Sequence, residues 1–123
     1  MESILTSIKK MLGIVEECED FDIDVMIHIN TALSTLQQIG VGSSKGFSIE
    51  DKNSTWADFV DDNLLADMSK TYVYLSVRLV FDPPSSSSVL ESMTKTKSEY
   101  EWRLQVRVDE LKSTEEEVIQ NGS

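Results

Sequence analysis

Apolar positions recur at helical spacing through most of the chain, and the longest such pattern lies between Asp62 and Asp82. Two apolar stripes there leave only a narrow polar seam, so this helix is expected at the centre of a bundle. Asp62 or Asn63 can cap its start. Pro83 and Pro84 end it, because proline lacks an N–H and disfavours the helical conformation of the preceding residue. The core positions that we expect include Leu33, Leu36, Leu64, Met68, Leu75 and Leu79.

The same spacing predicts three further helices, and together they indicate an all-α fold, a small four-helix bundle. The helices are expected at 3–12, 22–39, 62–82 and 87–102. A short helical turn is expected near 55–60, where Trp56 and Phe59 are predicted to be buried because large apolar side chains usually are. Between the second helix and this turn, residues 40–55 form a long loop with three glycines and no helical period. A loop of this length in a small domain often has a function.

The pattern changes near the C-terminus, where apolar and polar residues alternate from Trp102 to Val108. Alternation is the period of a half-buried strand, but short apolar runs also fit a helix, so two interpretations stay open. One is an extended C-terminal arm that pairs with an edge of another protein. The other is a continuation of the last helix. The residues expected to bind another protein or a neighbouring subunit are Trp102, Arg103, Leu104, Val106, Arg107 and Val108.

The remaining residues, 109–123, form an acidic C-terminal tail with the composition of a disordered segment, and 1–108 form the helical domain. We therefore expect that a chain lacking 102–123 still folds. Acidic residues also gather in and after the 40–55 loop, and the net charge is −11. This charge repels phosphate backbones and argues against sequence-specific nucleic-acid binding.

The chain has 123 residues, the size of one domain. A single cysteine, Cys18, excludes an internal disulfide and indicates a reducing compartment. The N-terminus does not resemble a signal peptide, and no apolar run is long enough to span a bilayer. We expect a soluble protein that is intracellular when it is made.

Candidate catalytic residues are few. His28 lies on a polar helical face without a recognisable nucleophile beside it, and the acidic neighbours of Cys18 disfavour its thiolate. One enzymatic alternative is an all-helical, magnesium-dependent nucleotide pyrophosphohydrolase, which needs an ExxE and an ExxD element on facing helices. Glu16 and Glu19 supply the first, but the later candidate at 50–53 lies in a loop and lacks the final Asp. A second alternative is an acidic DNA mimic that inhibits a host DNA-binding protein by occupying its basic groove.

The order and lengths of the segments carry a resemblance to a known family. FDIDVMIHINTALSTLQQIGVG, FSIEDKNSTWADF, LLADMSKTYVYLSVRLVFDPPSSSSVLESM and YEWRLQVRV follow a short first helix. This succession resembles the small head-tail connector (adaptor) proteins of long-tailed bacteriophages that infect Gram-positive bacteria. The resemblance implies a non-catalytic virion protein without a cofactor, which assembles in the host cytoplasm and resides in the capsid-tail neck.

The resemblance also implies partners. It predicts a homo-oligomeric ring, a dodecamer, that docks beneath the portal protein through its C-terminal parts and carries the downstream stopper or tail-completion protein, with no membrane contact. DNA would make only passive contact with the channel, whose acidic wall would repel phosphates. The residues expected to line the channel or to make loop contacts are Lys45, Phe47, Glu50, Asp51, Asp58, Asp61 and Asp62.

Overall fold

The computed structural model describes residues 2–42 and 45–121, with side chains as far as Glu115. The helices are α1 (Ile4–Met11), α2 (Asp22–Gln38), α3 (Trp56–Phe59), α4 (Asn63–Phe81) and α5 (Ser87–Asn121). The described ranges contain helices and no β-strand, which confirms the predicted all-α fold. No helix in them combines the length and the apolar character needed to cross a bilayer.

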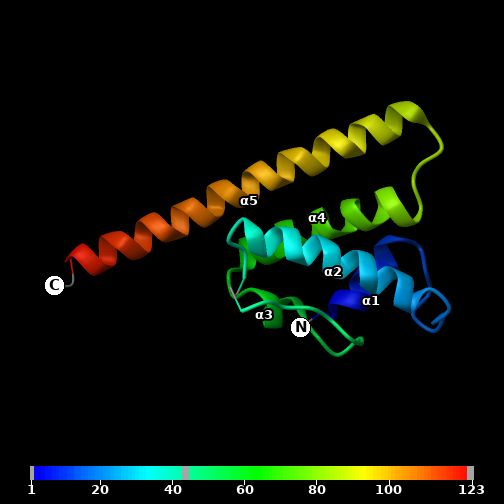
Figure 1. Ribbon diagram of the computed structural model, residues 1–123, viewed down its shortest axis with the longest axis horizontal. Helices are drawn as coiled ribbons and strands as arrows, with labels where there is room; N and C mark the ends of the chain where they lie inside the picture. The colour runs from blue at the N-terminus through cyan, green and yellow to red at the C-terminus, as the bar shows by residue number, and fades with distance from the viewer. Residues whose placement is uncertain (1, 43–44, 122–123) are drawn as a thin grey trace.

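Helix α4 is the centre of the molecule, as predicted. It packs against each of the other helices, and α2 and α5 lie on different sides of it and run antiparallel to it (Figure 1). Its start is capped by Asp62, whose Oδ2 accepts a hydrogen bond from the Leu65 N–H at 3.0 Å. Its end falls at Asp82, which has left the helical conformation just before Pro83.

The predicted core is mostly correct, with one clear error. Leu33, Leu36 and Leu75 are buried, and Met68 and Leu79 are half-buried. Leu64, however, is 49% exposed. It occupies the first turn of α4 on a side that is open to solvent, while Leu65, one residue later, is buried in the core.

The first helix is held to its neighbours by two buried polar contacts. The Lys9 side chain is buried, and its Nζ donates to the carbonyl oxygens of Glu16 (3.0 Å) and Cys18 (2.7 Å) and pairs with Asp22 Oδ1 at 2.8 Å. A buried ammonium is tolerated only with such partners. Lys9 therefore fixes the connection between α1 and α2.

The second contact joins α1 to α3. The indole N–H of Trp56 donates to Ser7 Oγ at 2.9 Å. Trp56 and Phe59 are both buried, which confirms their predicted place in the core.

Helix α5 decides between the two interpretations of the C-terminal segment. It runs without a break from Ser87 to Asn121, so the extended arm at 102–108 is wrong and the continuing helix is confirmed. The reason is that Leu104 and Val108, which are buried, are four residues apart and so lie on one face of a helix that packs on α4. Moreover, Ser87–Asn121 contains no glycine or proline that would end a helix.

Two expectations about the C-terminus change as a result. Residues 109–121, which have a disorder-like composition, are helical and continue α5, whose C-terminal end projects beyond the rest of the molecule (Figure 1). A deletion of 102–123 would also remove Leu104 and Val108 from the core. We therefore no longer expect that truncated chain to fold.

Candidate functional site

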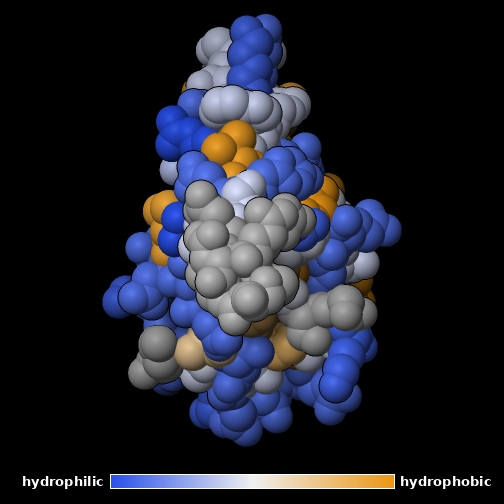
Figure 2. All heavy atoms as spheres, turned by 90° about the vertical axis from the view of Figure 1, so that its left-hand side faces the viewer, coloured by the Kyte–Doolittle hydropathy of each residue, from blue (hydrophilic) through white to orange (hydrophobic). Residues whose placement is uncertain are grey.

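The acidic residues expected near a channel come together, in part, at the end of the molecule from which α5 projects. There, the 39–42 connection, the α3–α4 junction and α5 surround an open hollow of about 620 Å³. Its lining includes Gly40, Gly42, Asp58, Phe59, Val60, Asp61, Asp62, Leu65, Leu111 and Glu115. Figure 2 views this end of the molecule, where hydrophilic side chains dominate and apolar ones form small, separate patches. The structure thus unites three of the predicted channel residues with a carboxylate of α5.

Asp62 and Arg107, which the sequence assigned to different functions, bind each other in this region. Arg107 donates through Nη2 to Asp62 Oδ1 (2.8 Å) and through Nε to Asp62 Oδ2 (3.1 Å). The hydrogen bond from Arg107 lowers the pKa of Asp62, and the same contact raises the pKa of Arg107. Because Asp62 also caps α4, one carboxylate joins the start of α4 to the middle of α5.

The other predicted channel residues occupy different settings. Asp58 forms a capping box with Thr55, in which each side chain binds the backbone N–H of the other residue. Asp51 accepts a hydrogen bond from the Asn53 N–H at 2.8 Å, a contact within its own turn. Asp58, Asp61, Asp51 and Glu50 are all exposed, so their carboxylates remain accessible to a partner or to solvent.

The loop that carries Lys45 and Phe47 is fixed to α2 by two amide side chains that the sequence analysis did not single out. Gln37 Nε2 donates to the Phe47 carbonyl (2.9 Å), and Gln37 Oε1 accepts from the Phe47 N–H (2.7 Å). Asn30 makes the same pair of bonds with Ile49, at 3.0 and 2.8 Å. Asn30 and Gln37 are seven residues apart on one helical face, and this spacing opposite the Phe47–Ile49 segment is the signal that could have found them. Lys45 is exposed in the same loop.

The residues predicted to bind the portal or a neighbour do not form one surface. Leu104 and Val108 face α4 and are buried, and Arg107 is engaged with Asp62. Trp102 is 67% exposed, and Arg103 is exposed beside it and pairs with Glu99 at 2.8 Å. Val106 is half-buried. Trp102, Arg103 and Val106 are therefore the members of that set that a partner could reach.

The residues weighed for catalysis do not come together. Glu16 and Glu19 lie in the connection between α1 and α2 and not on a helix, so the facing-helix arrangement of the pyrophosphohydrolase is wrong for this chain. His28 is half-exposed on α2. Among the described side chains, no group of three or more His, Cys, Asp or Glu residues is arranged to hold a metal ion.

The accessible charged and apolar groups of this all-α subunit lie on separate surfaces of its helices and connections. The model of the family described as phage connector protein matches residues 4–111, and the chain belongs to this family. Membership of this family implies a structural role at the head-tail junction of a bacteriophage, in the neck of the virion. No curated protein and no solved structure matches the chain significantly.

Proposed function

We propose that this connector protein forms a homo-oligomeric ring, a dodecamer, that docks beneath the portal protein, extends the DNA channel and carries the downstream stopper or tail-completion protein. The chain contributes surfaces and no catalysis. Membership of the connector family over residues 4–111 supports oligomerisation and contact with other neck proteins.

The projecting end of α5 is proposed as the part that binds the portal. The negative charge of this end is the main support for the proposal. Residues 112–121 extend the helix by about 15 Å at the usual rise per residue. This end has no basic residue in its last turn and contains the run Glu115, Glu116 and Glu117. Negative charge near a helix C-terminus is unfavourable, because that end already carries the negative pole of the helix dipole.

A basic surface on the partner would remove this penalty and hold the projecting helix in place. It would also recognise the arm by its charge, because complementary potentials steer association and exclude wrong partners. The proposed portal site is therefore a groove rich in Lys and Arg that receives the end of α5.

Truncation after Leu111 tests this step without touching the core. Leu111 is the last residue seen to pack against the core, so the shortened chain should stay folded. We expect it to lose attachment to portal-containing heads, measured by co-sedimentation of the purified protein with the heads. Attachment at the full-length level would contradict the α5 proposal and leave the ring proposal standing.

A matched pair of variants separates the charge of the arm from its length. Replacing Glu115, Glu116 and Glu117 by Gln should weaken attachment and reduce its dependence on salt. The control replaces Glu16, Glu17 and Glu19 by Gln, which changes the net charge equally in the exposed α1–α2 connection. Equal loss in both variants would show that overall charge, and not the arm, controls attachment.

The exposed carboxylates of Glu50, Asp51, Asp58 and Asp61 are proposed to line the channel, because they would repel the phosphates of passing DNA. Asp62, which the sequence analysis also placed at the channel, is a weaker candidate than these four, since Arg107 already neutralises its charge. Replacing Glu50, Asp51 and Asp61 by their amides should leave assembly intact and slow DNA exit from the head. Asp58 is kept because its carboxylate forms the capping box. A ring whose inner wall is mainly Lys and Arg would contradict this placement.

A further inference from the structure

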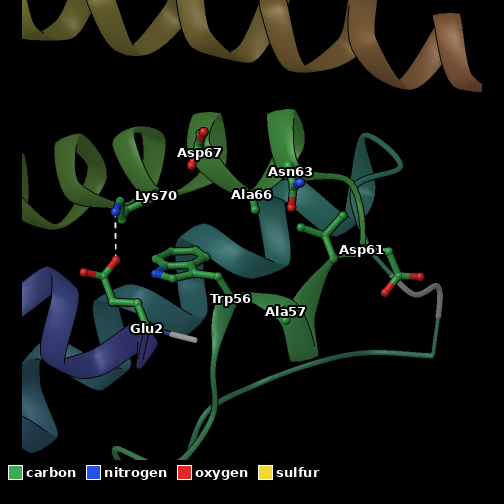
Figure 3. A pocket seen from close by; sticks show the side chains of 9 residues that line it. Glu2, Trp56, Ala57, Asp61, Asn63, Ala66, Asp67 and Lys70 are labelled. Atoms are coloured by element: carbon green, nitrogen blue, oxygen red, sulfur yellow. Dashed lines mark hydrogen bonds and ion pairs between the residues drawn. The ribbon is translucent and has the colours of Figure 1, made fainter.

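A hollow of about 360 Å³ lies between α3 and the first half of α4 (Figure 3). Its lining consists of Glu2, Trp56, Ala57, Val60, Asp61, Asn63, Ala66, Asp67 and Lys70. The apolar part is formed by Trp56, Ala57, Val60 and Ala66. The indole N–H of Trp56 is already bound to Ser7, so the ring can offer a ligand only apolar surface.

The rim of this hollow is negatively charged. Lys70 supplies the positive group, but its Nζ is paired with Glu2 at 2.8 Å at one side of the hollow. Asp61 and Asp67 are exposed and leave the rim with an excess of negative charge. The hollow therefore suits an apolar or aromatic side chain that has a cation beside it.

The same chain presents such a group on α5. Trp102 is 67% exposed, and Arg103 follows it. Arg103 pairs with Glu99 within one exposed helix turn, and its guanidinium lies 5.5 Å from the centre of the Tyr100 ring. Exposed contacts of both kinds contribute little, so Arg103 can exchange these partners at low cost. Tryptophan and arginine are also the residues most often found at the energetic centre of protein interfaces.

The hollow and Trp102 face in opposite directions. In Figure 3, α5 lies on the far side of α4 from Trp56. Trp102 is about 200° around the α5 axis from Leu104, which is buried against α4, so the indole points away from the body. Two complementary patches on opposite sides of one chain lead to head-to-tail association, which closes into a ring when the rotation between subunits fits.

We propose that Trp102 of one subunit occupies the α3–α4 hollow of the next copy of this chain, with Arg103 pairing with Asp67 of that copy. The second copy is the occupant that the structure favours, because both halves of the contact and both of its charges are present in one sequence. This inference rests on the proposed ring, for which it supplies the contact between subunits.

Truncating Trp102 tests the contact. Trp102→Ala should weaken self-association on the order of 10- to 100-fold, measured by sedimentation of the purified chain and by its occupancy on portal-containing heads. The matched control is Val89→Ala, which removes another exposed apolar side chain of α5 and should leave self-association unchanged. Self-association of Trp102→Ala at the wild-type level overturns the inference while the ring proposal stands.

A charge exchange tests the partner residue. Arg103→Asp and Asp67→Arg should each weaken self-association, and the double variant should recover most of the loss. Both positions are exposed, so the fold should tolerate the changes, which circular dichroism can verify. Single losses without recovery in the double variant overturn the Arg103–Asp67 pairing.

A photo-crosslinking residue at position 102 identifies the neighbour directly. Crosslinks to residues 56–70 of another copy support the proposal. Crosslinks to the portal, crosslinks to another part of this chain, or none at all overturn it. A wild-type chain that is monomeric both in solution and on heads would overturn the ring proposal together with this contact.

Discussion

Helices α4 and α5 are both long, but they are surrounded differently. Helix α4 spans 19 residues and packs against α1, α2, α3 and α5. Helix α5 spans 35 residues, and α4 is its main neighbour in the described fold (Figure 1). One helix is therefore used mainly to build the domain, and the other leaves a long surface for contacts outside it.

The difference is visible in single residues of α5. Leu104 is fully buried against α4, whereas Trp102, two positions earlier, is 67% exposed. Trp102 therefore adds little to the core and presents most of its indole to solvent, where a partner could cover it. The comparison separates side chains that stabilise the subunit from side chains that are available for assembly.

Removing the packed side chain should have the largest effect. Leu104→Ala is expected to lower the free energy of unfolding by about 2–5 kcal/mol, because it loses buried apolar surface and leaves a cavity against α4. Trp102→Ala should change it by less than about 0.5 kcal/mol. Urea unfolding of both variants measures the difference. Equal costs would mean that the two faces of α5 are not distinct.

Removing the carboxylate that joins α4 to α5 should have an intermediate effect. Asp62→Ala is expected to cost about 0.5–2 kcal/mol through loss of the helix cap. Asp62→Asn keeps a capping oxygen but loses the charged pair with Arg107, so it should be less destabilised than the alanine variant. If both variants unfold like the wild type, the link between the two helices contributes nothing to stability.

The same pair predicts a dependence on pH. The pKa of Asp62 is lower in the folded chain than in the unfolded one, because Arg107 binds the ionised carboxylate. Its contribution is therefore fully present above the unfolded pKa and is lost as pH falls through the lower folded pKa. The stability difference between the wild type and Asp62→Asn should shrink on acidification through this range. A difference that stays constant would contradict the charged pairing.

Removing the projecting end of α5 should have the smallest effect on stability. The chain truncated after Leu111 should unfold within about 0.5 kcal/mol of the full-length protein, since Leu111 is the last of the described side chains that packs on the core. Thermal unfolding followed by circular dichroism measures this. A large loss of stability would mean that residues 112–121 contribute to the domain and are not a separate arm.

Much of α4 and little of the outer part of α5 could be predicted from the sequence. The boundaries of α4 were predicted within one residue, because Asp62 and Pro83 act locally on the backbone. The conformation of 102–108 stayed open because a helix with one buried side chain in each turn can imitate alternation over a short run. Only the packing of this segment against α4 distinguishes a helix from a strand here.

The candidate sites could be predicted from the sequence even less well, for a related reason. Asp62 and Arg107 are 45 residues apart, and the sequence contains no sign that they pair. The α3–α4 hollow likewise depends on how Trp56 and Ala66 are placed around one another, which packing determines. The sequence could indicate which single residues lie on the surface. It could not indicate which of these residues contact one another.

Locating the protein in the virion tests the central claim most directly. A reconstruction of the virion neck by electron cryomicroscopy should show this chain as a closed ring beneath the portal, with the C-terminal end of α5 against a basic surface of the portal. Absence of the chain from purified virions, or its presence away from the neck, would contradict the account.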